Sequence, residues 1–255
     1  MKKTIQRVLA AVILFAMILS GGFSEVGKVH AEKQQGTTKR AIYVVFDNSG
    51  SMYGDGNKAW SQATYAMEVF AAMMNYESGD VMKVFPMHDI TTDGNTGSAT
   101  KSSMEIRGKD DIAQIHNMYT PKPGGTPYTQ VNNAAGELTK LLNAGSVDEG
   151  WLVVLTDGDF DNDIPASGLK ADLEGKAAAN ENLYVQYLAI GTDVKNIPEG
   201  NADKGLYAQK AGNTSEVVNE LAEISNRIFK RNEYAGYSSE DSGLEFRSEE
   251  RRVGK

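Results

Sequence analysis

The fold of this chain is decided by one stretch, residues 41–52, with the sequence Ala41-Ile42-Tyr43-Val44-Val45-Phe46-Asp47-Asn48-Ser49-Gly50-Ser51-Met52. Its first six residues carry no charge and are rich in β-branched and aromatic types, which indicates a strand buried on both faces, as in a parallel sheet. The strand ends at Asp47, and hydroxyls follow at alternate positions, Ser49 and Ser51. Two interpretations are open here. The three side chains are metal ligands at the carboxyl end of a strand, or they complete a turn and cap the next helix.

Further strands and helices alternate along the chain. Strands are expected at 81–85, 103–107 (an edge strand), 151–156, 183–190 and 206–208. Apolar residues at helical spacing predict helices at 59–75, 109–118, 127–143 and 169–180, and a last helix that Asn213 and Glu216 begin as a capping box. This alternation predicts an α/β fold with a doubly wound, mostly parallel central sheet flanked by helices.

Composition excludes several classes of function. The 255 residues contain no cysteine, so thiol catalysis, zinc–thiolate sites and disulfides are excluded. The three histidines lie far apart and show no metal-ligand spacing. The formal charge is −8, and residues 32–246 are more acidic still because both flanking segments are net positive. Such a chain is not expected to bind nucleic acid, which requires a basic surface, but it attracts divalent cations.

Residues 1–31 have the features of a secretory signal peptide. Lys2, Lys3 and Arg7 precede an apolar run at 8–19, and Val29-His30-Ala31 suits cleavage. The run is short for a membrane span, although an uncleaved N-terminal anchor is the alternative. Residues 32–38 are polar and are expected to form a linker. The body of the protein is therefore expected outside the cytoplasm, secreted or at the cell surface.

Three separated motifs carry oxygen side chains: Asp-x-Ser-x-Ser at 47–51 follows one apolar strand, Gly-Gly-Thr at 124–126 lies in a loop before a helix, and Thr-Asp-Gly at 156–158 ends another apolar strand. Together and in this order they resemble the metal-ion-dependent adhesion site (MIDAS) of von Willebrand factor A domains, of the bacterial secreted or surface-displayed type. The resemblance covers residues 39–232.

The resemblance implies an intact metal site with Mg²⁺, or Mn²⁺, held by Asp47, Ser49, Ser51, Thr126 and Asp157. Two aspartates and three hydroxyls are hard oxygen donors that suit Mg²⁺, which retains several waters. In the family, an open metal position accepts an Asp or Glu carboxylate from a protein partner, and no catalysis takes place. A shift of the threonine loop there brings the hydroxyl onto the metal while the second aspartate, here Asp157, retreats behind water.

The loop after Asp157 carries further aspartates at Asp159, Asp161 and Asp163. One interpretation is a second, weak Ca²⁺ site, because calcium loops space carboxylates in this way. The glycine and the acidic residue that such a loop needs at its sixth and twelfth positions are replaced by Asn162 and Gly168. The other interpretation is a solvated acidic rim beside the main site.

The end of the chain changes character twice. Residues 233–246 are polar and are expected to begin a further segment that is cut short, so a membrane anchor after residue 246 would be lost from this sequence. Residues 247–255 reverse the charge and resemble the translation of a sequencing-library adapter. The alternative is a plain basic tail.

Two other functions remain open on the sequence. A phosphohydrolase of another doubly wound fold would use Asp47 as its nucleophile, but such enzymes need a second aspartate where this chain has Ser49. The third hypothesis is a scaffold domain of a larger surface protein, in which the metal is structural.

Overall fold

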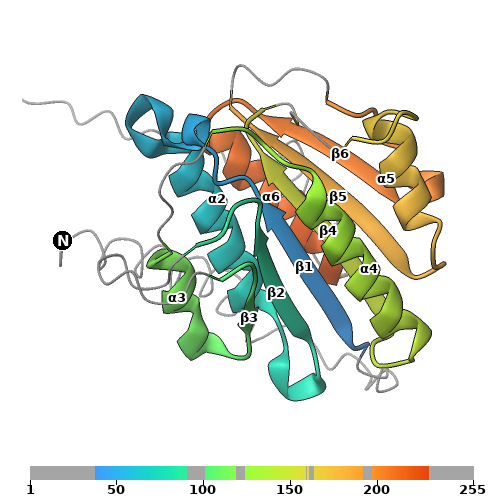
Figure 1. The fold of residues 1–255 in the computed structure, drawn as a ribbon. Coiled ribbons are helices and arrows are strands. Elements are labelled where there is room, and N and C mark those ends of the chain that lie inside the picture. The colour runs from blue at the N-terminus through green and yellow to red at the C-terminus, as the bar shows by residue number, and fades with distance from the viewer. Residues whose placement is uncertain are drawn as a thin grey trace, which may run out of the picture.

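Six strands form one sheet in the order β3-β2-β1-β4-β5-β6 (Figure 1). The computed structural model describes residues 38–90, 101–118, 124–158, 160, 164–191 and 197–229, with the side chains of 54–58 and 109 excepted. The strands are β1 Arg40–Phe46, β2 Val81–Pro86, β3 Met104–Ile106, β4 Glu149–Thr156, β5 Leu183–Ile190 and β6 Leu206–Ala211. All neighbours are parallel except β2 and β3, which pair in antiparallel fashion at one edge. The predicted fold class is confirmed.

The strand β1 lies at the centre because both its faces are apolar. Residues 41–46 are all buried, and β1 pairs with β2 on one side and β4 on the other. In the register with β4, Phe46 lies opposite Leu155. Asp47 and Thr156 therefore lie side by side at the carboxyl ends of β1 and β4.

Helices cover both faces of the sheet (Figure 1). They are α2 Gly54–Met73, α3 Ile112–His116, α4 Thr129–Asn143, α5 Leu169–Ala177 and α6 Thr214–Phe229, with single turns η1 Gly50–Tyr53, η2 Tyr76–Ser78, η3 Lys109–Asp111 and η4 Ala202–Lys204. One core, under α2, α3 and α6, contains Ile42, Val44 and Phe46. The other core, under α4 and α5, contains the alternate residues Tyr43 and Val45. The period-2 pattern of β1 thus fills two separate cores.

Close packing of α4 on β4 explains a glycine inside that strand. A Cβ at Gly150 would lie 3.0 Å from Leu142 Cδ1 of α4, so a larger residue would require that side chain to shift by a few tenths of an ångström. The backbone of β4 is therefore close to α4 at the end of the sheet opposite the predicted site.

Several predicted boundaries were wrong by a few residues. α2 begins at Gly54, five residues before the prediction, and α4 begins at Thr129 after Pro127. β6 extends to Ala211, because its inner residues pair with β5 although they are only partly buried. The Asn213 cap of α6 is confirmed, because Asn213 Oδ1 accepts from Glu216 N at 3.0 Å; the reciprocal bond of the predicted capping box is shifted by one residue, since Glu216 Oε2 accepts from Gly212 N at 2.6 Å.

The order of the strands reverses between β1 and β4. From β1 the chain passes through α2 to β2, whereas from β4 it passes through α5 on the opposite face to β5. Loops that leave adjacent strands toward opposite faces open a crevice at the carboxyl ends of those strands, where doubly wound folds bind ligands. The motifs at 47–51 and 156–158 lie at this reversal point, at the carboxyl ends of β1 and β4.

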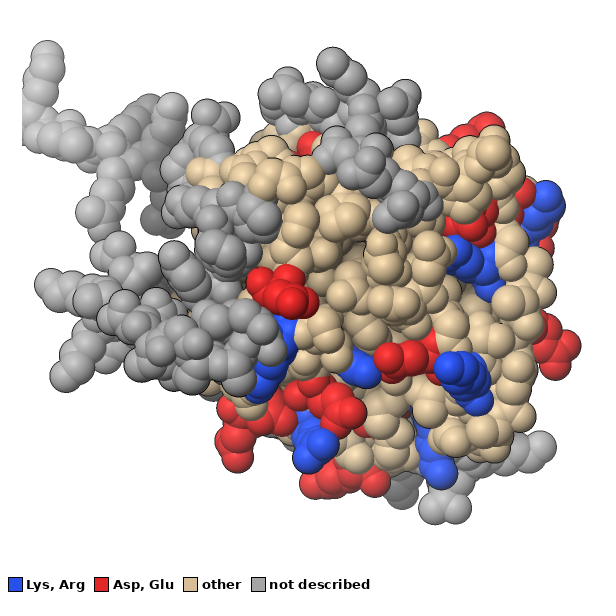
Figure 2. Space-filling view, viewed as in Figure 1, with Lys and Arg blue, Asp and Glu red and all other residues tan. Residues whose placement is uncertain are grey.

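On the face shown in Figure 2, acidic and basic side chains of the described residues are interspersed, without an extended basic patch. None of the helices in the described part of the chain combines the length and apolar character that a membrane span requires. The predicted signal peptide, the segment at 233–246 and the tail at 247–255 lie outside the described residues, as does nearly all of the linker.

Candidate metal site

Asp47 is the most constrained of the predicted ligands. It is fully buried, and its backbone N–H donates to the carbonyl of Leu155 at 2.8 Å, which extends the pairing of β1 with β4 by one residue. Its Oδ1 accepts from the backbone N–H of Ser49 at 2.8 Å, and its Oδ2 accepts from the hydroxyl of Thr156 at 2.8 Å. The carboxylate is thus held in one orientation by donors from both loops.

A chain of hydroxyls joins the two loops. The hydroxyl of Ser51 donates to Asp157 Oδ1 at 3.0 Å, and Ser49 Oγ lies 2.9 Å from Ser51 Oγ. Since Ser51 has one hydroxyl proton and gives it to Asp157, Ser49 must donate to Ser51. Four of the five predicted ligands, Asp47, Ser49, Ser51 and Asp157, therefore lie within one hydrogen-bonded group.

Thr126 is tied to this group through its neighbour Gly125. Its side chain is buried, with 5% exposed. Gly125 has φ of 81°, which favours glycine, and its carbonyl accepts from the Nε2 of His88 at 2.8 Å. Asn48 binds the backbone of His88 twice: its Nδ2 donates to the carbonyl at 2.7 Å, and its Oδ1 accepts from the N–H at 2.8 Å.

Two features of the site could not be predicted from the sequence: the pair of hydrogen bonds from the Asn48 side chain to the backbone of His88, called the Asn48 clamp below, and the role of Thr156. Asn48 and His88 connect loops that follow different strands, and side-chain bonds to a distant backbone leave no periodic signal. Thr156 was part of a recognised motif, but its function in orienting Asp47 becomes visible only when β1 and β4 are paired.

The electrostatics of the group favour a cation. Burial, and then the negative charge of Asp47, raise the pKa of Asp157 from its ordinary value of 3.8 to about 6, although the hydrogen bond from Ser51 opposes the shift. The negative charge of Asp47, close to the partly buried Asp157, disfavours the ionisation of Asp157. A divalent cation between them would remove that penalty.

The donor chemistry fits a hard divalent ion. In the described part of the chain, no three His, Asp or Glu side chains gather into a group that could hold a metal. The group described above differs in kind, because it has two carboxylates and its remaining oxygens are hydroxyls. Oxygen donors alone suit Mg²⁺ or Mn²⁺ better than softer metals. The aspartates of the predicted calcium loop, Asp159, Asp161 and Asp163, lie outside the described residues.

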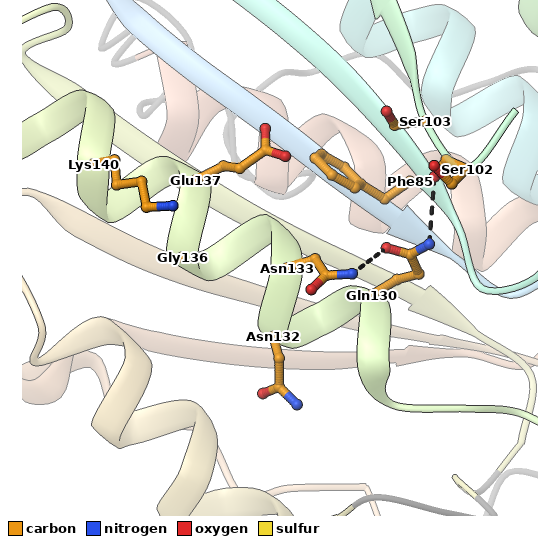
Figure 3. Close-up of a pocket in the computed structure, with 9 residues that line it drawn as sticks. All are labelled: Phe85, Ser102, Ser103, Gln130, Asn132, Asn133, Gly136, Glu137 and Lys140. Carbon is orange, nitrogen blue, oxygen red and sulfur yellow. Dashed lines mark hydrogen bonds between the residues drawn. The ribbon is translucent and has the colours of Figure 1, made fainter.

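A separate hollow of about 360 Å³ lies between α4 and the segment before β3 (Figure 3). Asn133 Nδ2 donates to Gln130 Oε1 at 3.0 Å, and Gln130 Nε2 donates to the carbonyl of Ser102 at 3.4 Å. Glu137, on the same wall, is paired with Lys83 at 2.7 Å. None of the five predicted ligands lines this hollow, so it is not part of the candidate metal site.

No protein-family model matches the sequence, and no curated protein matches it. Among solved structures, the pilus adhesin SpaC from Lactobacillus rhamnosus GG is similar, with a TM-score of 0.51 and 16% identity over 78% of this chain and 31% of that one.

Two further structures resemble the chain less closely. Proximal thread matrix protein 1 from the mussel byssus, in a form with a zinc-occupied MIDAS motif, has a TM-score of 0.48 and 15% identity over 74% of this chain and 48% of that one. The ArnB paralog VWA2 from Sulfolobus acidocaldarius has a TM-score of 0.46 and 15% identity over 74% and 45%.

The chain spans less than half the length of each of these proteins. At these identities the likeness establishes the fold alone, a doubly wound α/β domain of the von Willebrand factor A type.

Proposed function

We propose that this chain is an extracytoplasmic von Willebrand factor A domain that binds a protein partner through a divalent ion. Asp47, Ser49, Ser51, Thr126 and Asp157 would hold Mg²⁺ or Mn²⁺, and the ion would accept an Asp or Glu carboxylate from the partner. The bound ion supplies an electrophilic contact point. The protein supplies its position, at the crevice between β1 and β4.

One observation carries the proposal: hydrogen bonds gather Asp47, Ser49, Ser51 and Asp157 at the reversal point of the sheet. A plain βα turn would need only one of these loops. Here the loops after two adjacent strands share a network of oxygens, and the charge of Asp47 within it contributes to the raised pKa of Asp157.

The same geometry supports binding without catalysis. Both oxygens of Asp47 accept hydrogen bonds from Ser49 and Thr156, so the carboxylate is fixed as a ligand or a support for one. His88 gives its Nε2 proton to a backbone carbonyl, and its backbone is held by Asn48. The hydroxyls that do pair with carboxylates, Ser51 with Asp157 and Thr156 with Asp47, belong to residues that we propose as ligands of the ion or as supports for one, so we expect no catalysis from them.

The first test is metal binding measured by calorimetry. The parent is expected to bind Mg²⁺, and Asp47→Ala is expected to weaken binding severely, because it removes one of two carboxylates and the acceptor for Ser49 and Thr156. Asp203→Ala is the matched control, since Asp203 is exposed at the opposite edge of the sheet, in η4. Equal Mg²⁺ affinity in Asp47→Ala and the parent would contradict the site.

The second test is carboxylate recognition. An array of Asp- and Glu-containing peptides, with Asn and Gln versions as controls, is probed with the parent in Mg²⁺ and in chelator. Binding to acidic peptides alone, lost in chelator and in Thr126→Ala, is the expected result. Binding that survives chelator would favour the scaffold alternative, in which the metal does not contact the partner.

Catalysis and location each have a direct check. Turnover of a generic phosphoester that requires metal and is lost in Asp47→Asn would favour a phosphohydrolase instead.

The secreted location is tested by expressing the full chain and sequencing the N-terminus of the exported product. Cleavage after Ala31 is expected, whereas retention in the cytoplasm would contradict the assignment.

A further inference from the structure

Tyr128 lies two residues after Thr126, directly before α4, and its side chain is fully buried. Its hydroxyl donates to Asp172 Oδ2 of α5 at 2.6 Å. A phenol that donates to a carboxylate in a site with little water forms one of the stronger hydrogen bonds in proteins. The loop that carries Thr126 is therefore attached at its end to a different helix, α5.

The ring of Tyr128 also contacts the other ligand loop. Phe160, three residues after Asp157, packs edge-on against it, with 4.8 Å between ring centroids. Phe160 is 7% exposed, so this contact lies in the core under α4 and α5. One side chain thus touches the loop of Asp157 while its backbone continues the loop of Thr126.

Asp172 is itself held in place. Lys176, one turn along α5, lies 2.7 Å from Asp172 Oδ2, and the two side chains are 12% and 15% exposed. The Nζ of Lys176 also lies 5.4 Å from the centre of the Tyr128 ring. A charge this far removed from water needs its partners, so the phenol and the ammonium stabilise the same carboxylate.

We propose that Tyr128 is a positioning residue for the metal site: anchored on Asp172 of α5, it holds the loops of Thr126 and Asp157 in a fixed relation. The geometry makes α5 a support for ligands that it does not itself contribute. This inference rests on the proposed metal function and identifies what keeps the two ligand loops in register.

The main experiment removes only the hydroxyl, with Tyr128→Phe, and measures Mg²⁺ affinity by calorimetry. The ring contact to Phe160 remains, so the fold is expected to persist. Affinity is expected to fall about three- to tenfold, which is the factor that one net hydrogen bond contributes. The matched control is Tyr76→Phe, because the Tyr76 hydroxyl donates to the carbonyl of Ala71 at 3.0 Å near the opposite edge of the sheet. Its affinity should equal that of the parent.

A second pair of variants tests the anchor. Asp172→Ala removes the acceptor and also the partner of Lys176, so it should lose at least as much affinity as Tyr128→Phe, whereas Asp172→Asn keeps an oxygen that can accept from the phenol and should retain more affinity. The double variant Tyr128→Phe/Asp172→Ala should lose no more than Asp172→Ala alone, because the bond that Tyr128→Phe removes is already absent there. Additive losses, or parent affinity in Tyr128→Phe, would overturn the proposal. If Tyr128→Phe folds poorly, the comparison of the two Asp172 variants decides.

A metal-free measurement separates this inference from the proposed function. Amide hydrogen exchange in chelator is followed at Val131, whose N–H donates to the carbonyl of Tyr128, and at Gly158, whose N–H donates to the hydroxyl of Thr156. Tyr128→Phe should accelerate both, and Tyr76→Phe neither. If the parent binds no Mg²⁺, the proposed function fails and this exchange alone decides the coupling. Unchanged exchange at Gly158 would overturn it.

Discussion

Acidic side chains at the two ends of the sheet accept hydrogen bonds from different kinds of donor. At the amino end, Asp80 is 4% exposed and accepts from the backbone N–H groups of Arg40 and Asn75, both at 2.9 Å. Glu149, at the start of β4, is 3% exposed and accepts from the indole of Trp151 at 2.6 Å. Each carboxylate at this end meets N–H donors, which stabilise its charge.

At the carboxyl end, Asp47 and Asp157 follow adjacent strands and are linked through the hydroxyls of Ser49 and Ser51. Asp47 receives one backbone N–H, and the pKa of Asp157 is raised to about 6 by burial and by Asp47. At both ends of the sheet, acidic residues lie next to the terminus of a strand, but the groups that donate hydrogen bonds to them differ. At the amino end, buried acids accept from N–H groups, whereas at the carboxyl end two acids close to each other accept largely from hydroxyls, and we expect the second arrangement to favour a bound cation.

The largest effect on stability is expected at the amino end. Asp80→Ala leaves the N–H groups of Arg40 and Asn75 without their acceptor, so the free energy of unfolding should fall by about 2 to 4 kcal/mol. Urea denaturation in chelator measures it, with Asp203→Ala as the control. Mg²⁺ affinity should be unchanged in the folded variant. A loss below about 0.5 kcal/mol, the usual range for surface changes, would contradict the claim that Asp80 stabilises the fold through these N–H groups.

Magnesium should stabilise the parent through the carboxyl end. At a free concentration one hundred times the dissociation constant, the gain is about 2.7 kcal/mol. Asp157→Asn should lose most of this gain and Asp80→Ala should keep it, which thermal melts in Mg²⁺ and in chelator can show. An equal gain in Asp157→Asn would mean that the ion binds elsewhere.

Without metal, stability should decline as the pH rises between about 4 and 6. The folded pKa of Asp157 lies above its ordinary value, so the folded state binds the proton more tightly, and that advantage is lost through this window. The effect is modest because Asp157 is partly exposed to solvent. Asp47→Asn should flatten this part of the profile. An equally steep decline in that variant would remove Asp47 as a cause.

The smallest effect on stability is expected for Asn213, a polar residue that follows β6 at the carboxyl end of the sheet but is not part of the proposed metal site. Asn213→Ala removes the cap of α6 and should lower stability by about 1 kcal/mol, with no change in Mg²⁺ affinity. Calorimetry and urea denaturation of the same sample test both parts. Weaker metal binding in this variant would show that the site extends beyond the loops after β1 and β4.

The fold was predictable because its central strands are apolar on both faces. Residues 41–46 and 152–155 could be strands of a parallel sheet and little else, and the stripe of Val217, Leu221, Ile224 and Ile228 marks α6. Helix starts were harder. The start of α2 at Gly54 has no side-chain cap, so no residue type signals it.

The site was predictable in its ligand types and not in its supports. Local spacing at a strand end offered Asp47, Ser49 and Ser51, the resemblance to von Willebrand factor A domains added Asp157 and Thr126, and the structure brings Asp47, Ser49, Ser51 and Asp157 into one hydrogen-bonded group. The clamp of Asn48 on His88 and the bond of Tyr128 to Asp172 join residues 40 and 44 positions apart. Such contacts depend on the packing of whole elements, which local sequence does not encode in a readable period.

The most direct test of the central claim is a crystal structure of the protein grown with Mn²⁺, in which anomalous scattering locates the ion. If the proposed site binds the ion, we expect one strong peak at the carboxyl ends of β1 and β4, within about 2.0–2.3 Å of the hydroxyls of Ser49 and Ser51. The peak should be absent in Asp47→Ala. A peak confined to the loop of Asp159, Asp161 and Asp163, or no peak at the crevice in a fully folded parent, would contradict it.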